Sequence, residues 1–268
     1  MSDIPEAVRQ QGMHPFLAMK PPSSWKRVDS PLCIVLLHPM GVPQVVEPGP
    51  ELTPETVGAA VAEARTTVRD HGAPMLVWLT TSDHPWLGPA LAAQGLVNED
   101  SPGFENIENV MALLSAPTRG TESGSADGVE IRLVDTFEDF VAGKNVEQVA
   151  FDMPLDLVAK EVAEYPQRWD EYLTDECYVR WNALVDGQTV GTATAMLGPV
   201  GINLFGGAVL ESARGRGCYR ALVNARWDYA VERGTPALTV QAGRMSMPIL
   251  ESLGFQLVEA MIVYVDKL

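Results

Sequence analysis

Residues 206–229 place a loop of alternating arginine and glycine between an apolar strand and a helix, and this order constrains the fold more than any other feature of the chain. Arg214 and Arg216 alternate with Gly215 and Gly217, directly before an amphipathic pattern. Free N–H groups in the first turn of a helix, together with the helix dipole, favour an anion there. Glycine lets the backbone approach that anion without a Cβ in the way. The segment predicts an α/β fold with a pyrophosphate cradle; an ordinary surface loop is the alternative.

The residues after this loop continue the alternation of helices and strands. A helical pattern over residues 219–233 ends at Gly234, and Pro236 follows just past it. Three further elements are expected from the pattern: a strand over 237–240, a short helix over 249–255 closed by Gly254, and a strand around 257–265.

Two short motifs make residues 129–268 resemble the GNAT superfamily of acyl-CoA-dependent N-acetyltransferases. The cofactor motif of that family is Gln/Arg-x-x-Gly-x-Gly/Ala. Here Arg214-Gly-Arg-Gly217-Cys-Tyr219 matches its first two fixed positions and replaces the last small residue with tyrosine. Ser252-Leu-Gly-Phe255 resembles the second signature, Tyr-x-x-Leu-Gly-Phe, and the spacing between the two motifs fits without an insertion.

The first half of the chain shows the same order of elements without an arginine–glycine loop. A helix is expected from Thr53, as N-cap, to Gly72, followed by a strand over residues 75–80. A helix over 86–94 and a strand near 109–114 complete the series.

Two local parallels indicate an internal repeat. His71-Gly-Ala-Pro corresponds to Arg233-Gly-Thr-Pro, and Leu91-Ala-Ala-Gln-Gly-Leu corresponds to Leu250-Glu-Ser-Leu-Gly-Phe. Simple alternation of helices and strands, which mimics a repeat, is the alternative. The predicted fold is α/β, an α+β mixed sheet in two tandem GNAT-like halves, of which the C-terminal half carries the acyl-CoA site. The expected division is a degenerate N-terminal domain at 1–116, a linker rich in Gly and Ser at 117–128, and a GNAT domain at 129–268.

Composition argues against several kinds of partner for this protein. The formal net charge is −16 without a basic stripe, which argues against nucleic acid as a partner. No run approaches the ~20 apolar residues that span a bilayer, and the N-terminus lacks the pattern of a signal peptide, so no membrane partner and a cytoplasmic location are expected. Three widely spaced cysteines suggest neither a disulfide framework nor a metal site.

The resemblance implies acyl transfer from acetyl-CoA, or another acyl-CoA, to an amine. In the family, a splayed strand before the loop binds the pantetheine arm, and the loop holds the pyrophosphate. A glycine pair inside that strand, Gly206-Gly207, suits a bulge. The implied cofactor-binding residues are Ala208, Val209, Leu210, Arg214, Gly215, Arg216, Gly217, Cys218, Tyr219 and Arg220.

The catalytic residues are unknown from the sequence, because the family's usual general acid, a tyrosine, is replaced here by Leu250. Weak candidates are Tyr264 in the last strand, Tyr219 in the loop and Glu211 as a base. Glu259 is a further possible base.

By the same resemblance, Asp152 and Tyr165 lie where the family builds its acceptor pocket. Trp169, Tyr172 and Trp181 either line that pocket or belong to the core.

The function expected from the sequence is direct transfer of an acyl group, foremost acetyl, to a primary amine of a small molecule, by a monomer or homodimer. Two alternatives stay open. The first is a catalytically degenerate protein that binds acyl-CoA, and the second is an acyltransferase with a different donor.

Overall fold

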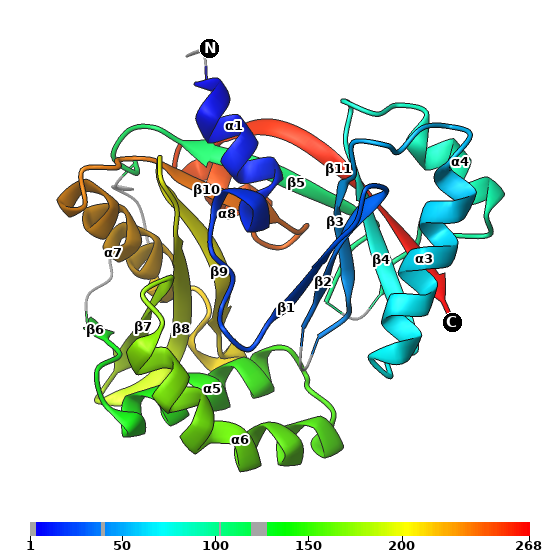
Figure 1. Cartoon of the computed structure of the whole chain (residues 1–268). Helices are drawn as coiled ribbons and strands as arrows, with labels where there is room; N and C mark the ends of the chain where they lie inside the picture. Colours follow the sequence, from blue (N-terminus) through cyan, green and yellow to red (C-terminus); the bar gives the residue numbers. More distant parts are fainter. Residues whose placement is uncertain (1–3, 39–40, 102, 119–127) are drawn as a thin grey trace. The chain divides into compact units, whose positions relative to one another are not determined.

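The computed structural model describes residues 4–38, 41–101, 103–118 and 128–268 (Figure 1). The chain forms two compact units. Unit 1 comprises Met1–Pro22, Met111–Val240 and Met245–Gln256, and unit 2 comprises Ser23–Val110, Gln241–Arg244 and Leu257–Leu268. Neither unit is a single continuous segment.

The part of the sheet in unit 1 is mixed and has the strand order β10-β9-β8-β7-β6. Helices cover both of its faces. β9 pairs with β10 in parallel and with β8 antiparallel. Its elements are α1 (Glu6–Met13), α2 (Pro15–Ala18), β6 (Val129–Leu133), α5 (Phe137–Ala150), α6 (Leu155–Thr174), β7 (Tyr178–Val185), β8 (Gln188–Leu197), β9 (Ile202–Val209), the 3-10 turn η1 (Glu211–Ala213), α7 (Cys218–Glu232), β10 (Leu238–Ala242) and α8 (Met247–Ser252); the last two residues of β10 belong to unit 2.

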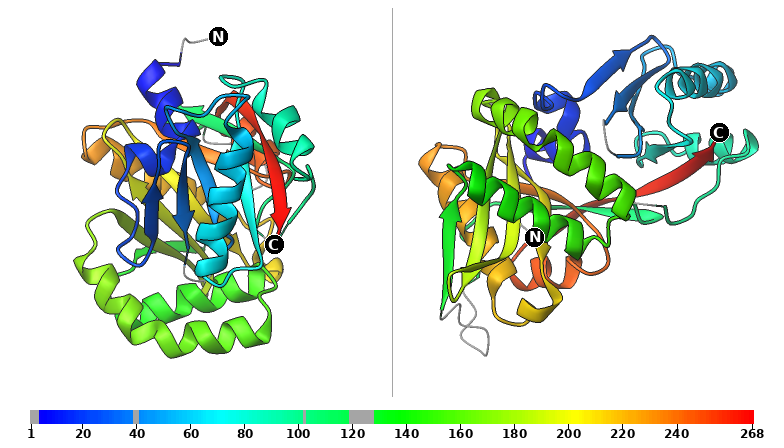
Figure 2. Two further views of the ribbon diagram at one scale, coloured as in Figure 1. Left: turned by 45° about the vertical axis from the view of Figure 1, so that its right-hand side comes forward. Right: turned by 90° about the horizontal axis from the view of Figure 1, so that it is seen from below.

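The two faces of this sheet carry different helices (Figure 2). α5 packs against β8 and β9 on one face, and α7 packs against β7, β8 and β9 on the other. α5 begins where the Thr136 hydroxyl accepts a hydrogen bond of 3.1 Å from the Asp139 N–H, a side-chain cap. α6 begins directly after Pro154, as expected for a proline that fits only the first turn.

Unit 2 contains the strand order β1-β2-β3-β4-β11 with α3 and α4 packed on it. Its core is mostly aliphatic and includes Trp78, of which 1% is exposed. The elements are β1 (Lys26–Asp29), β2 (Cys33–Leu37), β3 (Gln44–Pro48), α3 (Val57–Asp70), β4 (Met75–Thr80), α4 (Leu87–Ala93), β5 (Ile107–Leu113) and β11 (Gln256–Lys267); the last three residues of β5 and the first of β11 belong to unit 1.

The predicted elements are present with small shifts of their ends. β4 has the predicted bounds, and α7, β10, α8 and β11 follow the arginine–glycine loop in the predicted order. The helix expected from Thr53 begins only at Val57. Thr53 and Thr56 bond to each other instead, because the Thr53 N–H donates to the Thr56 hydroxyl at 2.8 Å and forms a turn before the helix.

The division into domains at 1–116 and 129–268 stays a prediction, and the compact units follow a different division of the chain. The last strand, β11, pairs antiparallel with β4 from Ile262–Thr80 to Lys267–Met75, so the C-terminus belongs to unit 2. The first helices belong to unit 1, where Oε1 of the Gln11 side chain accepts a hydrogen bond from the Val200 N–H at 3.3 Å. Most of the predicted linker, residues 119–127, lies outside the described residues.

Candidate functional site

The arginine–glycine loop leads from the end of β9 into the first turn of α7. Arg214, Gly215 and Arg216 are exposed, and Gly217 is the N-cap with φ of +80°. Only glycine adopts that left-handed conformation without strain. The first N–H of α7 that bonds back to the cap is that of Ala221, at 2.9 Å from the Gly217 carbonyl. The N–H groups of Cys218, Tyr219 and Arg220 donate to no backbone carbonyl of the described residues, as expected at the start of a helix.

The two sequence motifs lie side by side in unit 1. Arg220, in the first turn of α7, donates from Nη2 to the hydroxyl of Ser252 at 2.7 Å. Ser252 is the first residue of the Ser-Leu-Gly-Phe motif at the end of α8. α7 and α8 are therefore neighbours at the loop.

β9 carries the bulge that its glycine pair predicts. Thr192 of β8 pairs with Ala208 of β9, and Thr194 pairs with Phe205. Between these two pairs β9 therefore has one residue more than β8. Gly206 has φ of +55°. The described ladder between β9 and β10 covers Ile202–Leu204, and Phe205, the next residue, is 41% exposed.

The α7 face of the bulge is lined by an aromatic ring and a cation. A Cβ on Gly207 would lie 3.3 Å from Cε2 of Tyr219 and 4.0 Å from Nη2 of Arg226. Arg226 is 1% exposed; its Nε donates to the Leu222 carbonyl at 3.0 Å and its Nη1 to the Thr194 carbonyl at 3.3 Å. Burial lowers the pKa of Arg226 to about 10, which leaves the group protonated at neutral pH.

The opposite face of the bulge meets a buried network of charges from α5, α6 and β7. A Cβ on Gly206 would lie 3.4 Å from Oε1 of Glu147. Glu147 forms an ion pair with Arg180 of β7, and Lys144 bridges it to Glu161 of α6, with N–O distances of 2.7 and 2.8 Å. Burial opposes ionisation of Glu147, yet Arg180 and Lys144 outweigh it and hold its pKa below the usual value.

The residues expected around the acceptor are found in or near this network. Gln148 donates to the Tyr165 hydroxyl at 2.7 Å and to Glu161 at 2.8 Å. Burial raises the pKa of Tyr165, so its hydroxyl stays protonated. Asp152 follows α5 with φ of +48°.

The aromatic candidates pack as core. Tyr165, Trp169 and Tyr172 surround Phe140, and Trp181 meets Tyr229 edge-on with ring centroids 5.3 Å apart. Their rings therefore fill space between elements of unit 1.

The proposed catalytic side chains have separate surroundings. Leu250 is fully buried in α8. Glu211 is exposed at the start of η1. Tyr264 and Glu259 lie in β11 of unit 2, where the Tyr264 hydroxyl would be 2.7 Å from a Cβ on Gly88 of α4 and Glu259 accepts from the Ser82 N–H at 2.5 Å. Packing of Tyr264 against the unit 2 core gives it a structural role.

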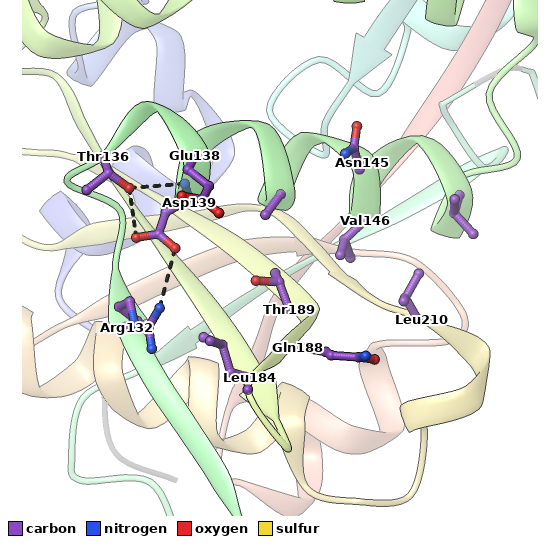
Figure 3. Close-up of a pocket in the computed structure, with 13 residues that line it drawn as sticks. Arg132, Thr136, Glu138, Asp139, Asn145, Val146, Leu184, Gln188, Thr189 and Leu210 are labelled. Carbon is purple, nitrogen blue, oxygen red and sulfur yellow. Dashed lines mark hydrogen bonds and ion pairs between the residues drawn. The ribbon is translucent and has the colours of Figure 1, made fainter.

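A pocket of about 660 Å³ lies elsewhere in unit 1, between α5 and the turn that joins β7 to β8 (Figure 3). Arg132 and Asp139 form an ion pair of 3.6 Å at one end of it. Leu210 is the only residue that it shares with the expected cofactor set. The pocket therefore does not coincide with the arginine–glycine loop.

Sequence reasoning missed Arg226, Glu147 and Arg180. The signal for Arg226 was a charge within the apolar stripe of α7, because it lies four residues after Leu222 and four before Ala230, and all three are buried. No comparable local signal marks Arg180, since its carboxylate partner is 33 residues away.

Among the described residues, no group of three or more His, Cys, Asp and Glu side chains is arranged to hold a metal ion. The helices of the described ranges are likewise all too short or too polar to cross a bilayer.

A known family model matches the part of the chain that contains the bulge and the arginine–glycine loop. Residues 146–255 match the model of the Acetyltransferase (GNAT) family, a span that contains the bulge, the loop and both motifs. No curated protein matches the chain at a significant level.

Solved structures resemble the chain over nearly its whole length. A GCN5-related N-acetyltransferase from Kribbella flavida has a TM-score of 0.67 at 17% identity, covering 97% of this chain and 93% of that one. A tandem GNAT protein from the clavulanic acid biosynthesis pathway has a TM-score of 0.61 at 15% identity, covering 98% and 88%. A GCN5-related N-acetyltransferase from Sphaerobacter thermophilus has a TM-score of 0.61 at 16% identity, covering 90% and 82%. At these identities the likeness establishes a fold, the tandem GNAT arrangement of a mixed α/β sheet.

Proposed function

We propose that the chain transfers an acyl group, foremost acetyl, from acyl-CoA to a primary amine of a small molecule, and the match of residues 146–255 to the acetyltransferase (GNAT) family model supports this proposal. The observation that carries the proposal is the glycine-capped N-terminus of α7 directly after a bulged strand. This arrangement supplies unpaired N–H donors beside exposed arginines.

The residues present fit the diphosphate end of coenzyme A. Gly215 has φ of +79° with open space where a Cβ would be, so the loop leaves room at its surface. The N–H groups of Gly217, Cys218 and Tyr219 open α7, and Arg214, Arg216 and Arg220 add positive charge. Upstream, Ala208, Val209 and Leu210 would bind the pantetheine arm through their backbone.

The chemistry needs few protein groups. When bound, acyl-CoA supplies a thioester carbonyl carbon to which the amine nitrogen forms a bond as the carbon–sulfur bond breaks and the thiolate leaves. The protein must orient the two reactants, exclude water and accept the ammonium proton. Gly206 and Gly207 have no partner in the described registers of β9 with β8 and β10, so their N–H groups would suit the carbonyl oxygen.

Calorimetry followed by a thiol-release assay tests the proposal. Acetyl-CoA and coenzyme A should each bind to the full-length protein, and acetyl-CoA should release free thiol with at least one member of a panel of small primary amines. Absence of binding by both ligands would refute the proposal.

The burial of Leu250 favours a second candidate, a protein of this fold that binds acyl-CoA without turnover, because no acid stands at the family's usual position. Binding without thiol release across the panel would support that candidate. Tyr219 inside the motif favours a different acyl donor, which would show as tighter binding of another acyl-CoA than of acetyl-CoA.

A further inference from the structure

Arg180 and Arg226 are the buried arginines among the described residues of unit 1, and of the two only Arg180 has a carboxylate partner. Arg180 is paired with Glu147. Arg226 forms no ion pair with any described carboxylate, and its Nη2 has no hydrogen-bond partner among the described residues. Burial of an unpaired charge is strongly unfavourable unless another group compensates for it. Tyr219 is the one group that electrostatically favours the charged form of Arg226 among the described residues, so an anion near this guanidinium would be stabilised.

The position of this unpaired group points to where the anion would be. Nη2 lies 4.0 Å from the point that a Cβ on Gly207 would occupy, on the α7 face of the β9 bulge. Nη1 donates to the carbonyl of Thr194, next to the extra residue of the bulge. The guanidinium thus anchors the bulge with one nitrogen and keeps another free beside it.

The same face lacks the acid that the family provides. α8 lies against the start of α7 through the Arg220–Ser252 hydrogen bond, and Leu250 of α8 is fully buried. Tyr219 contributes its ring to this face, and burial raises the pKa of its hydroxyl. Arg226 and Leu250 thus belong to the two helices that meet at the loop, α7 and α8. One of these residues is a buried cation, and the other is an apolar side chain where the resemblance implies an acid.

We propose that Arg226 stabilises the coenzyme A thiolate that departs in acyl transfer, and so replaces an acid at position 250. The inference rests on the proposed function. Its chemistry is balanced without an added reagent: the carbon–sulfur electron pair stays on sulfur, the buried cation lowers the free energy of that charge, and solvent protonates the thiolate after release. Arg226 is a positioning and electrostatic residue behind the strand.

The first test uses the wild-type protein and needs no acceptor. The affinities of coenzyme A and of desulfo-coenzyme A, which lacks the thiol, are measured by calorimetry from pH 6 to pH 9. If Arg226 favours the thiolate, the affinity ratio of the two ligands rises as the pH increases, up to about tenfold for each unit by which the bound thiol pKa is lowered. A ratio that stays constant with pH would overturn the inference and leave the proposed function intact. Failure of either ligand to bind would overturn both.

The second test titrates the bound thiol by its thiolate absorbance in three variants. Arg226→Met, which removes the charge and keeps the length, should return the pKa of the bound thiol to the value of free coenzyme A. Arg226→Lys should retain part of the lowered pKa. Arg233→Gln removes an exposed charge next to the end of the same helix and should leave the pKa unchanged.

A merely structural role of Arg226 predicts a different pattern. Loss of the bonds to Leu222 and Thr194 would weaken binding of coenzyme A and desulfo-coenzyme A equally, with the same thiol pKa in every variant. If Arg226→Met does not fold, as judged by circular dichroism, the pH dependence of the affinity ratio in the wild-type protein still tests the inference.

Discussion

The ring of Tyr219 lies against the bulge of β9, with Cε2 3.3 Å from the place of a Cβ on Gly207. The family motif has a small residue at the position of this tyrosine. The ring is directed inward from the first turn of α7 toward the strand, where burial raises the pKa of its hydroxyl. The Tyr219 side chain, which replaces the small residue of the motif, therefore packs against the bulge and does not block the exposed face of the loop.

Tyr219→Ala should consequently destabilise unit 1 and leave the diphosphate site in place. Loss of a half-buried aromatic ring is expected to cost about 2 kcal/mol of unfolding free energy. Urea denaturation measures the loss, and coenzyme A affinity measured on the folded variant should change by less than about tenfold. A hundredfold loss of affinity at unchanged stability would contradict this placement and make Tyr219 a ligand contact.

Leu250→Tyr should lower stability and give no gain in turnover. Leu250 has no exposed surface, so a larger side chain must displace its neighbours in α8, at a cost of about 1–3 kcal/mol. Thermal unfolding checks the cost. A stable variant with faster thiol release would show that only the tyrosine acid was lacking.

The ion pair of Glu147 and Arg180 should stabilise the fold at neutral pH and weaken in acid. Because the native pKa of Glu147 lies below its ordinary value of 4.5, this contribution is fully present above pH 4.5 and is lost as the pH falls through the lower native value. Arg180→Met, which leaves Glu147 paired with Lys144, should destabilise the fold at pH 7 by less than the ~3–5 kcal/mol expected for a fully unpaired buried charge. In a double-mutant cycle with Glu147→Gln, the two effects should be strongly non-additive; simple additivity would argue against the pair.

Glu108 of unit 2 has the opposite pH dependence. Burial raises its pKa to about 7, and the Glu105 N–H donates to it at 3.1 Å. A carboxyl with a raised native pKa stabilises the fold less as the pH rises from its ordinary value of 4.5 toward 7. Glu108→Gln should therefore increase stability at pH 8 by about 2 kcal/mol and change it little at pH 4. Equal effects at both pH values would contradict the shift.

Local sequence signals predicted the elements around the loop because glycines mark the ends of these elements or an irregularity within them. Gly217 and Gly234 flank α7, and Gly206-Gly207 marks the bulge. The pairing of β11 with β4 was not predictable, since strand partners far apart in sequence leave no local trace. For the same reason the buried pair of Glu147 and Arg180 was missed, whereas Arg226 left a visible signal as a charge on the apolar stripe of its helix.

The central claim is that the start of α7 binds the diphosphate of acyl-CoA, and Gly217→Glu tests it most directly. The change places a carboxylate at the N-cap, where the pyrophosphate would bind. Gly234→Glu is the matched control, because Gly234 has φ of +75° against +80° for Gly217 and lies just past the other end of the same helix. Calorimetry should show coenzyme A binding to the wild type and to Gly234→Glu, with affinity reduced at least about a hundredfold in Gly217→Glu. Equal affinity in all three proteins would contradict the assignment of the site.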